Sequence, residues 1–291
     1  MTTEAPAAAF APGRGIGARP WLPLLAGFLV LAIPTIVSLG QQVWSTDIGA
    51  HGPIVVATGL WLLYHEGLRP ADARAAAAWR HVLFLVLPGF ALYIFGRSYD
   101  FISLEVLGLY ATFIAFVWRL FGLQKLRSVA FPLVYLGFVI PPPGWLIDRA
   151  TAPLQLFVSH VAEAVTGMLG YPVAREGVTL FVGPYELLVE QACAGMNSII
   201  GLIAVSLFYI YIVRKASLRY ASLLVLLILP VAVVVNIIRI VVLILITYHF
   251  GDQAAQGFLH GTTGMVLFGM ALLLIFGADT VLWRLAGRRK S

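Results

Sequence analysis

Residues 220–248 have the sequence YASLLVLLILPVAVVVNIIRIVVLILITY, in which Arg239 is the single charged side chain. A helix crosses the hydrocarbon core of a bilayer with ~20 consecutive apolar residues. This stretch is longer than that requirement and therefore predicts a transmembrane helix. It also decides the fold class of the chain, because similar apolar runs recur on both sides of it.

Composition supports a membrane protein throughout. Hydrophobic residues make up 60% of the 291 residues and charged residues 11%, whereas soluble domains are roughly 45–50% apolar and roughly 25% charged. The formal net charge of +6 comes from short Lys and Arg clusters between apolar runs, which favours topology signals over nucleic-acid binding. One cysteine cannot form an intramolecular disulfide. We expect no cofactor or metal, because the chain lacks Cys/His metal spacing, a P-loop and a dinucleotide fingerprint.

We predict an all-α polytopic membrane protein with about eight transmembrane helices. The predicted spans are 21–39, 52–64, 82–95, 101–116, 129–140, 192–213, 220–248 and 262–283. The prolines at 141–143 end the fifth span, since proline cannot continue a helix. One transmembrane domain then covers residues 21–285, between a disordered tail (1–20) and a basic tail (286–291).

The segment between the fifth and sixth spans (145–190) differs from the rest. Polar residues recur at helical spacing over 145–169, which predicts an amphipathic helix on the membrane surface. Residues 171–190 alternate apolar and polar side chains around a break at Gly183-Pro184. This pattern predicts a small β-hairpin outside the bilayer.

The basic loops give the orientation. Lys and Arg clusters follow the second, fourth, sixth and eighth spans, and Arg119, Lys125 and Arg127 form the predicted loop after the fourth. The positive-inside rule then places both termini in the cytoplasm. The amphipathic helix and the hairpin face the outside, which is the periplasm if the protein lies in a bacterial inner membrane.

Three chemically active side chains are predicted at one depth on the outer side. Cys193 lies at the outer end of the sixth span and His260 at the outer end of the eighth. Arg239 follows Arg219, the cytoplasmic anchor of the seventh span, by 20 residues, which is roughly 30 Å of helix or one hydrocarbon thickness. Arg239 is therefore expected near the outer interface.

These residue types suggest cysteine-based acyl transfer on a peptide bond near the membrane surface. A thiolate is the nucleophile, but it is a small fraction of a free thiol at neutral pH. A nearby His removes the thiol proton and later protonates the leaving amine. An Arg stabilises the developing oxyanion and favours the thiolate. Candidates for supporting residues are Glu190, Gln191, Asn197 and Asn236.

The same residues also fit other interpretations. Taken alone, Cys193 could be a small apolar residue that fills space in the packing. Arg239 could be an interface residue whose charged end reaches water, and His260 could be an ordinary residue at the end of a loop. His249 and His160 compete with His260 as the base. The alternative for the whole chain is a non-enzymatic transporter or an assembly factor for polysaccharide export. A transporter leads us to expect mid-membrane ionisable residues or inverted repeats.

An ordered set of short motifs resembles a known family. The motifs are DIGAHGP (47–53), the prolines at 141–143, GYPVAREG (170–177), EQACAG (190–195), NIIRI (236–240), YHFG (248–251) and FLH (258–260). Together they resemble the exosortase/archaeosortase family of multi-pass membrane transpeptidases, over about residues 20–285. The chain departs from that family at Ala194, where Ser is usual, and at Gly261, where Asp is common.

The resemblance implies roles and partners. Cys193 would be the nucleophile, Arg239 the family's arginine and His260 the proton-transfer partner. The substrates would be exported proteins that end in a short Pro-Glu-Pro-like motif, a transmembrane helix and a basic end. The cleaved acyl group would pass to an acceptor, such as a lipid or glycan, linking the protein to exopolysaccharide and surface-protein sorting. Membrane lipids are the other expected partner, and nucleic acid is not one.

Overall fold

The computed structural model describes residues 22–46, 49–68, 77–188, 199–214, 218–255 and 263–288. The predicted fold class is confirmed, because most of these residues are helical and one small sheet is present. The helices are α1 Leu22–Gln42, α2 Gly52–His65, α3 Trp79–Ser98, α4 Ile102–Ser128, α5 Ala130–Leu136, η2 Gly137–Val139, α6 Gly144–Met168, α9 Ile199–Arg214, α10 Leu218–Phe250 and α12 Thr263–Arg288.

Every predicted span overlaps one of these helices, but fewer than eight of the described helices are long and apolar enough to cross a membrane. Four described helices are long and apolar enough to cross a membrane, over Leu22–Gln42, Trp79–Ser98, Ile102–Ser128 and Val225–Phe250. A fifth candidate is the pair Ala130–Val139 and Gly144–Met168, which is bent by 88°. The apolar helices Gly52–His65, Ile199–Val213 and Gly269–Val281 are shorter. Eight spans are therefore not confirmed.

The predicted basic loop after the fourth span is wrong. Arg119, Lys125 and Arg127 all lie within α4, which bends at Gly122 with φ +79° and continues to Ser128. Glycine adopts this positive φ without the steric cost of a Cβ atom. The chain therefore bends at a glycine kink, and Lys125 Nζ donates a hydrogen bond of 2.8 Å to the backbone carbonyl of Glu66 at the end of α2.

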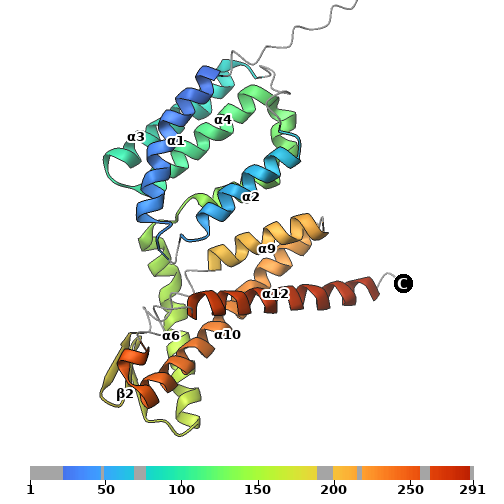
Figure 1. Cartoon of the computed structure of the whole chain (residues 1–291). Helices are drawn as coiled ribbons and strands as arrows, with labels where there is room; N and C mark the ends of the chain where they lie inside the picture. The colour runs from blue at the N-terminus through green and yellow to red at the C-terminus, as the bar shows by residue number, and fades with distance from the viewer. Residues whose placement is uncertain are drawn as a thin grey trace, which may run out of the picture.

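The first helices form one end of the molecule (Figure 1), where α4 packs against α3 and α1. The pair α3 and α4 is held at close range by small residues, as membrane helices often are. A Cβ atom at Gly96 would lie 2.2 Å from the backbone nitrogen of Glu105. This close approach brings the carboxylate of Glu105 between the three helices.

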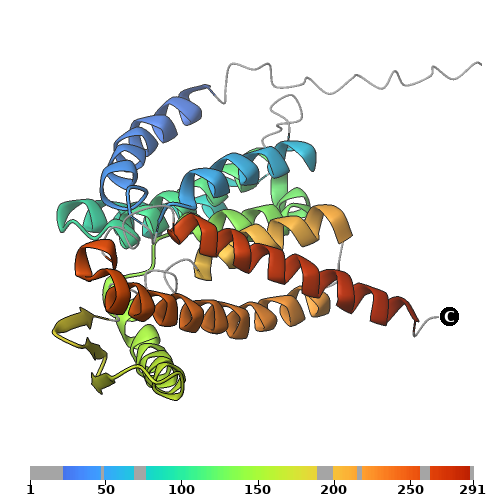
Figure 2. The same cartoon turned by 60° about the horizontal axis from the view of Figure 1, so that its bottom comes forward.

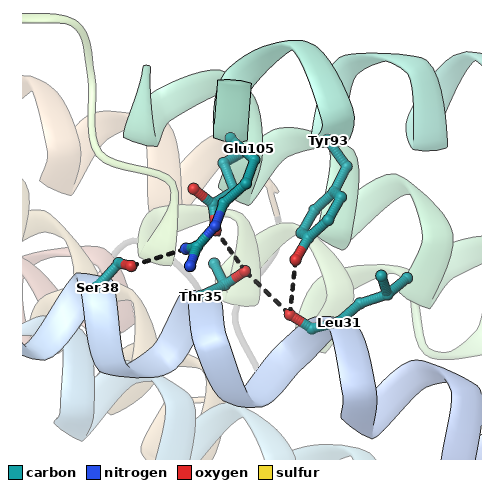
Figure 3. Close-up of polar contacts among 6 residues, drawn as sticks. Leu31, Thr35, Ser38, Tyr93 and Glu105 are labelled. Carbon is teal, nitrogen blue, oxygen red and sulfur yellow. Dashed lines mark hydrogen bonds and ion pairs between the residues drawn. The ribbon is translucent and has the colours of Figure 1, made fainter. Parts of the chain in front are cut away.

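Glu105 is the centre of a polar network inside this apolar end (Figure 3). The residue is 3% exposed, and its Oε1 accepts hydrogen bonds from Thr35 Oγ1 at 2.7 Å and from Arg97 Nη1 at 3.1 Å. Arg97 also donates to Ser38 Oγ at 2.9 Å. A buried carboxylate needs such partners because desolvation penalises its charge. The network therefore fixes the second half of α1 against α3 and α4.

We expect Arg97→Ala to destabilise this end of the protein. The substitution removes the cation from a buried carboxylate, and losing a partner of that kind costs about 1–3 kcal/mol. The lower end of this range applies, because the Arg97 side chain is 47% exposed. The measurement is the thermal midpoint of the detergent-solubilised protein. Arg80→Ala, an exposed arginine near the start of the same helix, is the control, and equal midpoints for the two variants would contradict the prediction.

The amphipathic helix predicted over 145–169 is confirmed as α6, and its apolar face packs against α10 and the sheet. Val158 and Ala162 are fully buried there, in a cluster with Leu180 of the sheet and Ile240 of α10. Prolines at 141–143 separate α6 from the preceding short helices. The position of α6 on a membrane surface remains a prediction.

The β element has three strands, so the predicted single hairpin is incomplete. β1 Val173–Glu176 pairs antiparallel with β2 Thr179–Val182, which pairs antiparallel with β3 Tyr185–Leu188. Both loops have two residues and begin with a glycine at positive φ, Gly177 at +59° and Gly183 at +60°. Glycine at the first position of a two-residue loop is typical of tight hairpins. The additional strand β1 follows from the second turn at Gly177.

Candidate active site

Arg239 lies on α10, the long helix predicted from residues 220–248. This helix is continuous over Leu218–Phe250, with Pro230 inside it. Arg239 is therefore 21 residues from the start of α10 and 11 from its end, or about 31 Å and about 16 Å along the axis at 1.5 Å per residue. The continuous helix between Arg219 and Arg239, on which the depth estimate depends, is present.

Arg239 is 4% exposed, and Asn236 one turn earlier is 2% exposed. Two apolar clusters flank them on α10. Val235 belongs to a cluster with Leu202 of α9 and Ala271 of α12, and Ile240 belongs to the cluster with α6 and the sheet. Arg239 is thus enclosed by protein where the two clusters meet. An arginine within a membrane helix is costly and is a functional-site candidate by default.

Five of the predicted site residues lie outside the described residues. They are Glu190, Gln191, Cys193 and Asn197, within 189–198, and His260, within 256–262. The structure therefore places Arg239, Asn236 and His249 from the predicted set, and the proximity of Cys193 and His260 to Arg239 stays a prediction.

Described residues near these two segments pack in the apolar cluster that contains Ile240, the residue after Arg239. Leu187 of β3 and Ile199, the first residue of α9, both contact the cluster that contains Ile240. Ala255, which precedes the second segment, is fully buried in the same cluster. The described elements before and after the Cys193 segment, and before the His260 segment, therefore share one apolar cluster with Ile240, which follows Arg239 on α10.

The helix directions agree with this arrangement. In Figures 1 and 2, α2, α9 and α12 run in the same general direction, with their first turns at the same side of the molecule, and α10 runs the opposite way. Packing of α10 against both α9 and α12 supports the view. The described first turns of α2, α9 and α12, which follow the outer ends predicted for spans two, six and eight, thus lie at one side of the fold. Which side of a membrane they face remains a prediction.

His249, a competing candidate for the base, has a separate environment. Its side chain is exposed, and Nε2 lies 3.0 Å from the hydroxyl of Tyr171. The imidazole also packs edge-on against the rings of Tyr171 and Tyr248. Ten residues separate it from Arg239 on the same helix, which is about 15 Å along the axis. His160, on α6, is exposed as well.

One residue next to this region was not among the predicted site residues. His51 directly precedes α2, and its side chain packs against Gly201 in the first turn of α9. A Cβ atom at Gly201 would lie 3.2 Å from His51 Cβ. The motif over 47–53 pointed to His51 only through the family resemblance. Sequence patterns do not show which helix a loop residue contacts.

The fold and these residues define a polytopic helical membrane protein with a buried arginine on a helix that packs against two others. Residues 43–277 match the family described as transmembrane exosortase, and the chain therefore belongs to the exosortase family. Membership implies a transmembrane sorting transpeptidase. No curated protein and no solved structure matches the chain.

Proposed function

We propose that this exosortase is a cysteine transpeptidase that cleaves C-terminal sorting signals of exported proteins. In this proposal it lies in the bacterial inner membrane, with both termini in the cytoplasm and the site at the periplasmic face. Its substrates carry a short Pro-rich motif, one transmembrane helix and a basic end. The acyl group passes to an acceptor of the lipid or glycan class, in support of surface-protein and exopolysaccharide sorting.

The observation that carries the proposal is the burial of Arg239 on α10, the helix that packs against both α9 and α12. Cys193 precedes Ile199 of α9 by six residues, and His260 precedes Thr263 of α12 by three. Short segments therefore connect the two reactive residues to helices that pack against α10. An enclosed arginine also acts in a low effective dielectric, where its attraction for an anion is stronger than in water.

The proposed reaction has two steps. The Cys193 thiolate attacks the scissile carbonyl carbon, and the oxyanion that develops is stabilised by the Arg239 guanidinium. The C–N bond then breaks, the leaving amine takes a proton from His260, and a thioester remains. In the second step the acceptor gives its proton to His260 and attacks the thioester carbonyl. The new acyl bond forms and the thiolate is released.

The other predicted residues have supporting roles in this proposal. Asn236 lies one helical turn from Arg239 and is buried with it, so its amide is suited to orient the guanidinium. Glu190, Gln191 and Asn197 flank the nucleophile in sequence. The substrate helix would enter from the bilayer, and the sheet and α6 would help to hold the motif at the surface.

The test is processing of a tagged protein that carries such a sorting signal, co-expressed with the enzyme and followed on a gel. We expect a shorter product with the wild-type enzyme and none with an empty vector. Absence of processing for a panel of such signals, with the enzyme expressed and inserted, would contradict the proposal.

The same assay identifies the proton carrier. We expect His260→Ala to lower processing by at least about 10²-fold, since general acid–base catalysis contributes typically 10²–10⁴-fold. His249→Ala is the matched control, and we expect it to remain within about threefold of wild type because the Tyr171 hydroxyl engages that imidazole about 15 Å along α10 from Arg239. A large loss in His249→Ala with normal His260→Ala processing would reverse the assignment.

A further inference from the structure

The loop between α1 and α2 holds His51 in a narrowly defined position. A Cβ atom at Gly52 would lie 2.1 Å from the indole nitrogen of Trp44, and one at Gly49 would lie 2.4 Å from the carbonyl oxygen of Val43. Neither position accepts a larger residue without movement of the loop. His51 itself has helical backbone angles, φ −74° and ψ −18°, directly before the first residue of α2. The two glycines near His51 are therefore closely packed against Val43 and Trp44.

The imidazole faces the start of α9. The Cβ position of the buried Gly201 is 3.2 Å from His51 Cβ, 3.4 Å from Cγ and 3.6 Å from Nδ1. Gly201 is the third residue of α9, and the EQACAG motif that contains Cys193 ends four residues before that helix begins. His51 thus contacts the first turn of α9, the first described element after the predicted nucleophile, although His51 and Cys193 are 142 residues apart in sequence.

His51 is a polar exception in its surroundings. It lines a small, mostly apolar pocket whose other walls include Val43, Trp44, Phe138, Pro141 and Pro142. His51 is the one titratable side chain among the described residues that line this pocket, and the first two turns of α9 contain none. A partly buried imidazole among apolar groups loses hydration.

We propose that His51 is a positioning residue of the active site, which holds the first turn of α9 and through it the segment that carries the nucleophile. The inference rests on the proposed function, in which Cys193 is that nucleophile. Acyl transfer needs the reacting atoms within about 3–3.5 Å, and a displacement of about 1 Å costs up to about 10²-fold in rate. The contact of His51 with the first turn of α9 would limit such a displacement of Cys193.

The test uses the fact that Cys193 is the single cysteine of the chain. A membrane-impermeant maleimide therefore reports on one site, without a substrate. We expect His51→Ala to change the labelling rate of Cys193 at least fivefold and to lower kcat at least tenfold, with KM within about twofold. The labelling rate and kcat of His51→Gln should be closer to wild type than those of His51→Phe. The amide of Gln can still form hydrogen bonds, whereas the phenyl ring of Phe replaces only the volume of the imidazole.

Two further variants complete the design. His65→Ala removes an exposed histidine at the other end of α2, stacked on Trp61, and should match wild type. Gly201→Ala should lower kcat when His51 is present, but it should lower kcat little further in the His51→Ala background. The effects of substitutions at two contacting residues are not additive. Gly269→Ala, on α12 with nothing within 4 Å of the added Cβ, is its control.

The outcomes separate the two proposals. Labelling and turnover of His51→Ala within twofold of wild type would overturn the role of His51, and so would full recovery in His51→Phe. Continued processing by Cys193→Ala would instead overturn the proposed function, whatever the labelling of the His51 variants shows. Size-exclusion profiles of each variant in detergent establish that the compared proteins are folded.

Discussion

Cys193→Ala is expected to abolish processing of a tagged sorting-signal substrate, by at least about 10³-fold. Removing the nucleophile of an acyl-transfer enzyme eliminates the covalent intermediate, and comparable losses in other such enzymes reach about 10⁶-fold. The measurement is the ratio of processed to full-length substrate on a gel over time, at matched enzyme levels.

Ala194→Ser is the matched control for this prediction. It changes the neighbouring residue to the one usual in the exosortase family, at a similar volume, and we expect it to retain processing. Thiol labelling gives an independent check, because a nucleophilic cysteine reacts faster than an inert buried one and its reaction rises with pH as the thiolate forms. An unreactive Cys193, together with undiminished processing by Cys193→Ala, would leave the transporter or assembly-factor interpretation.

Arg239→Ala is expected to lower processing by about 10²–10³-fold, the range seen when one oxyanion-stabilising donor is removed. Arg239→Lys should retain part of the activity at most, since the ammonium keeps the charge but lacks the planar fork of donors. Both rates are measured with the same substrate and normalised to the amount of folded enzyme in detergent.

The control must separate chemistry from membrane anchoring. Arg80, at the start of α3, is exposed, whereas Arg239 is 4% exposed and enclosed by two apolar clusters. We expect Arg80→Ala to process at the wild-type rate. Wild-type rates in both Arg239 variants would return that residue to an anchoring role.

Burial is the reason we favour a chemical role for Arg239. An arginine that only anchors a helix extends its charged end to the headgroup region, and its guanidinium remains accessible. A guanidinium enclosed by protein costs free energy that anchoring does not explain. The same reasoning separates Arg239 from His249, which is exposed at the end of the same helix and contacts Tyr171.

Much of the fold was predictable because it depends on local patterns. Apolar runs must form helices in a bilayer, since unpaired backbone groups cannot be tolerated in hydrocarbon, and a described helix overlaps every predicted span. The errors occurred where one glycine decides the path. Gly122 bends α4 without ending it, and Gly177 adds a strand to the predicted hairpin.

The sequence by itself determined the membrane class, the helices and the continuous run that carries Arg239, because periodicity and hydropathy act over short distances. It also supplied the family resemblance, which the match over residues 43–277 confirms. Only the tertiary structure decided that Arg239 is enclosed between two clusters, that His249 is held by Tyr171, and that His51 meets Gly201 of α9. These contacts depend on which helix faces pack together, and packing joins residues that no local pattern relates.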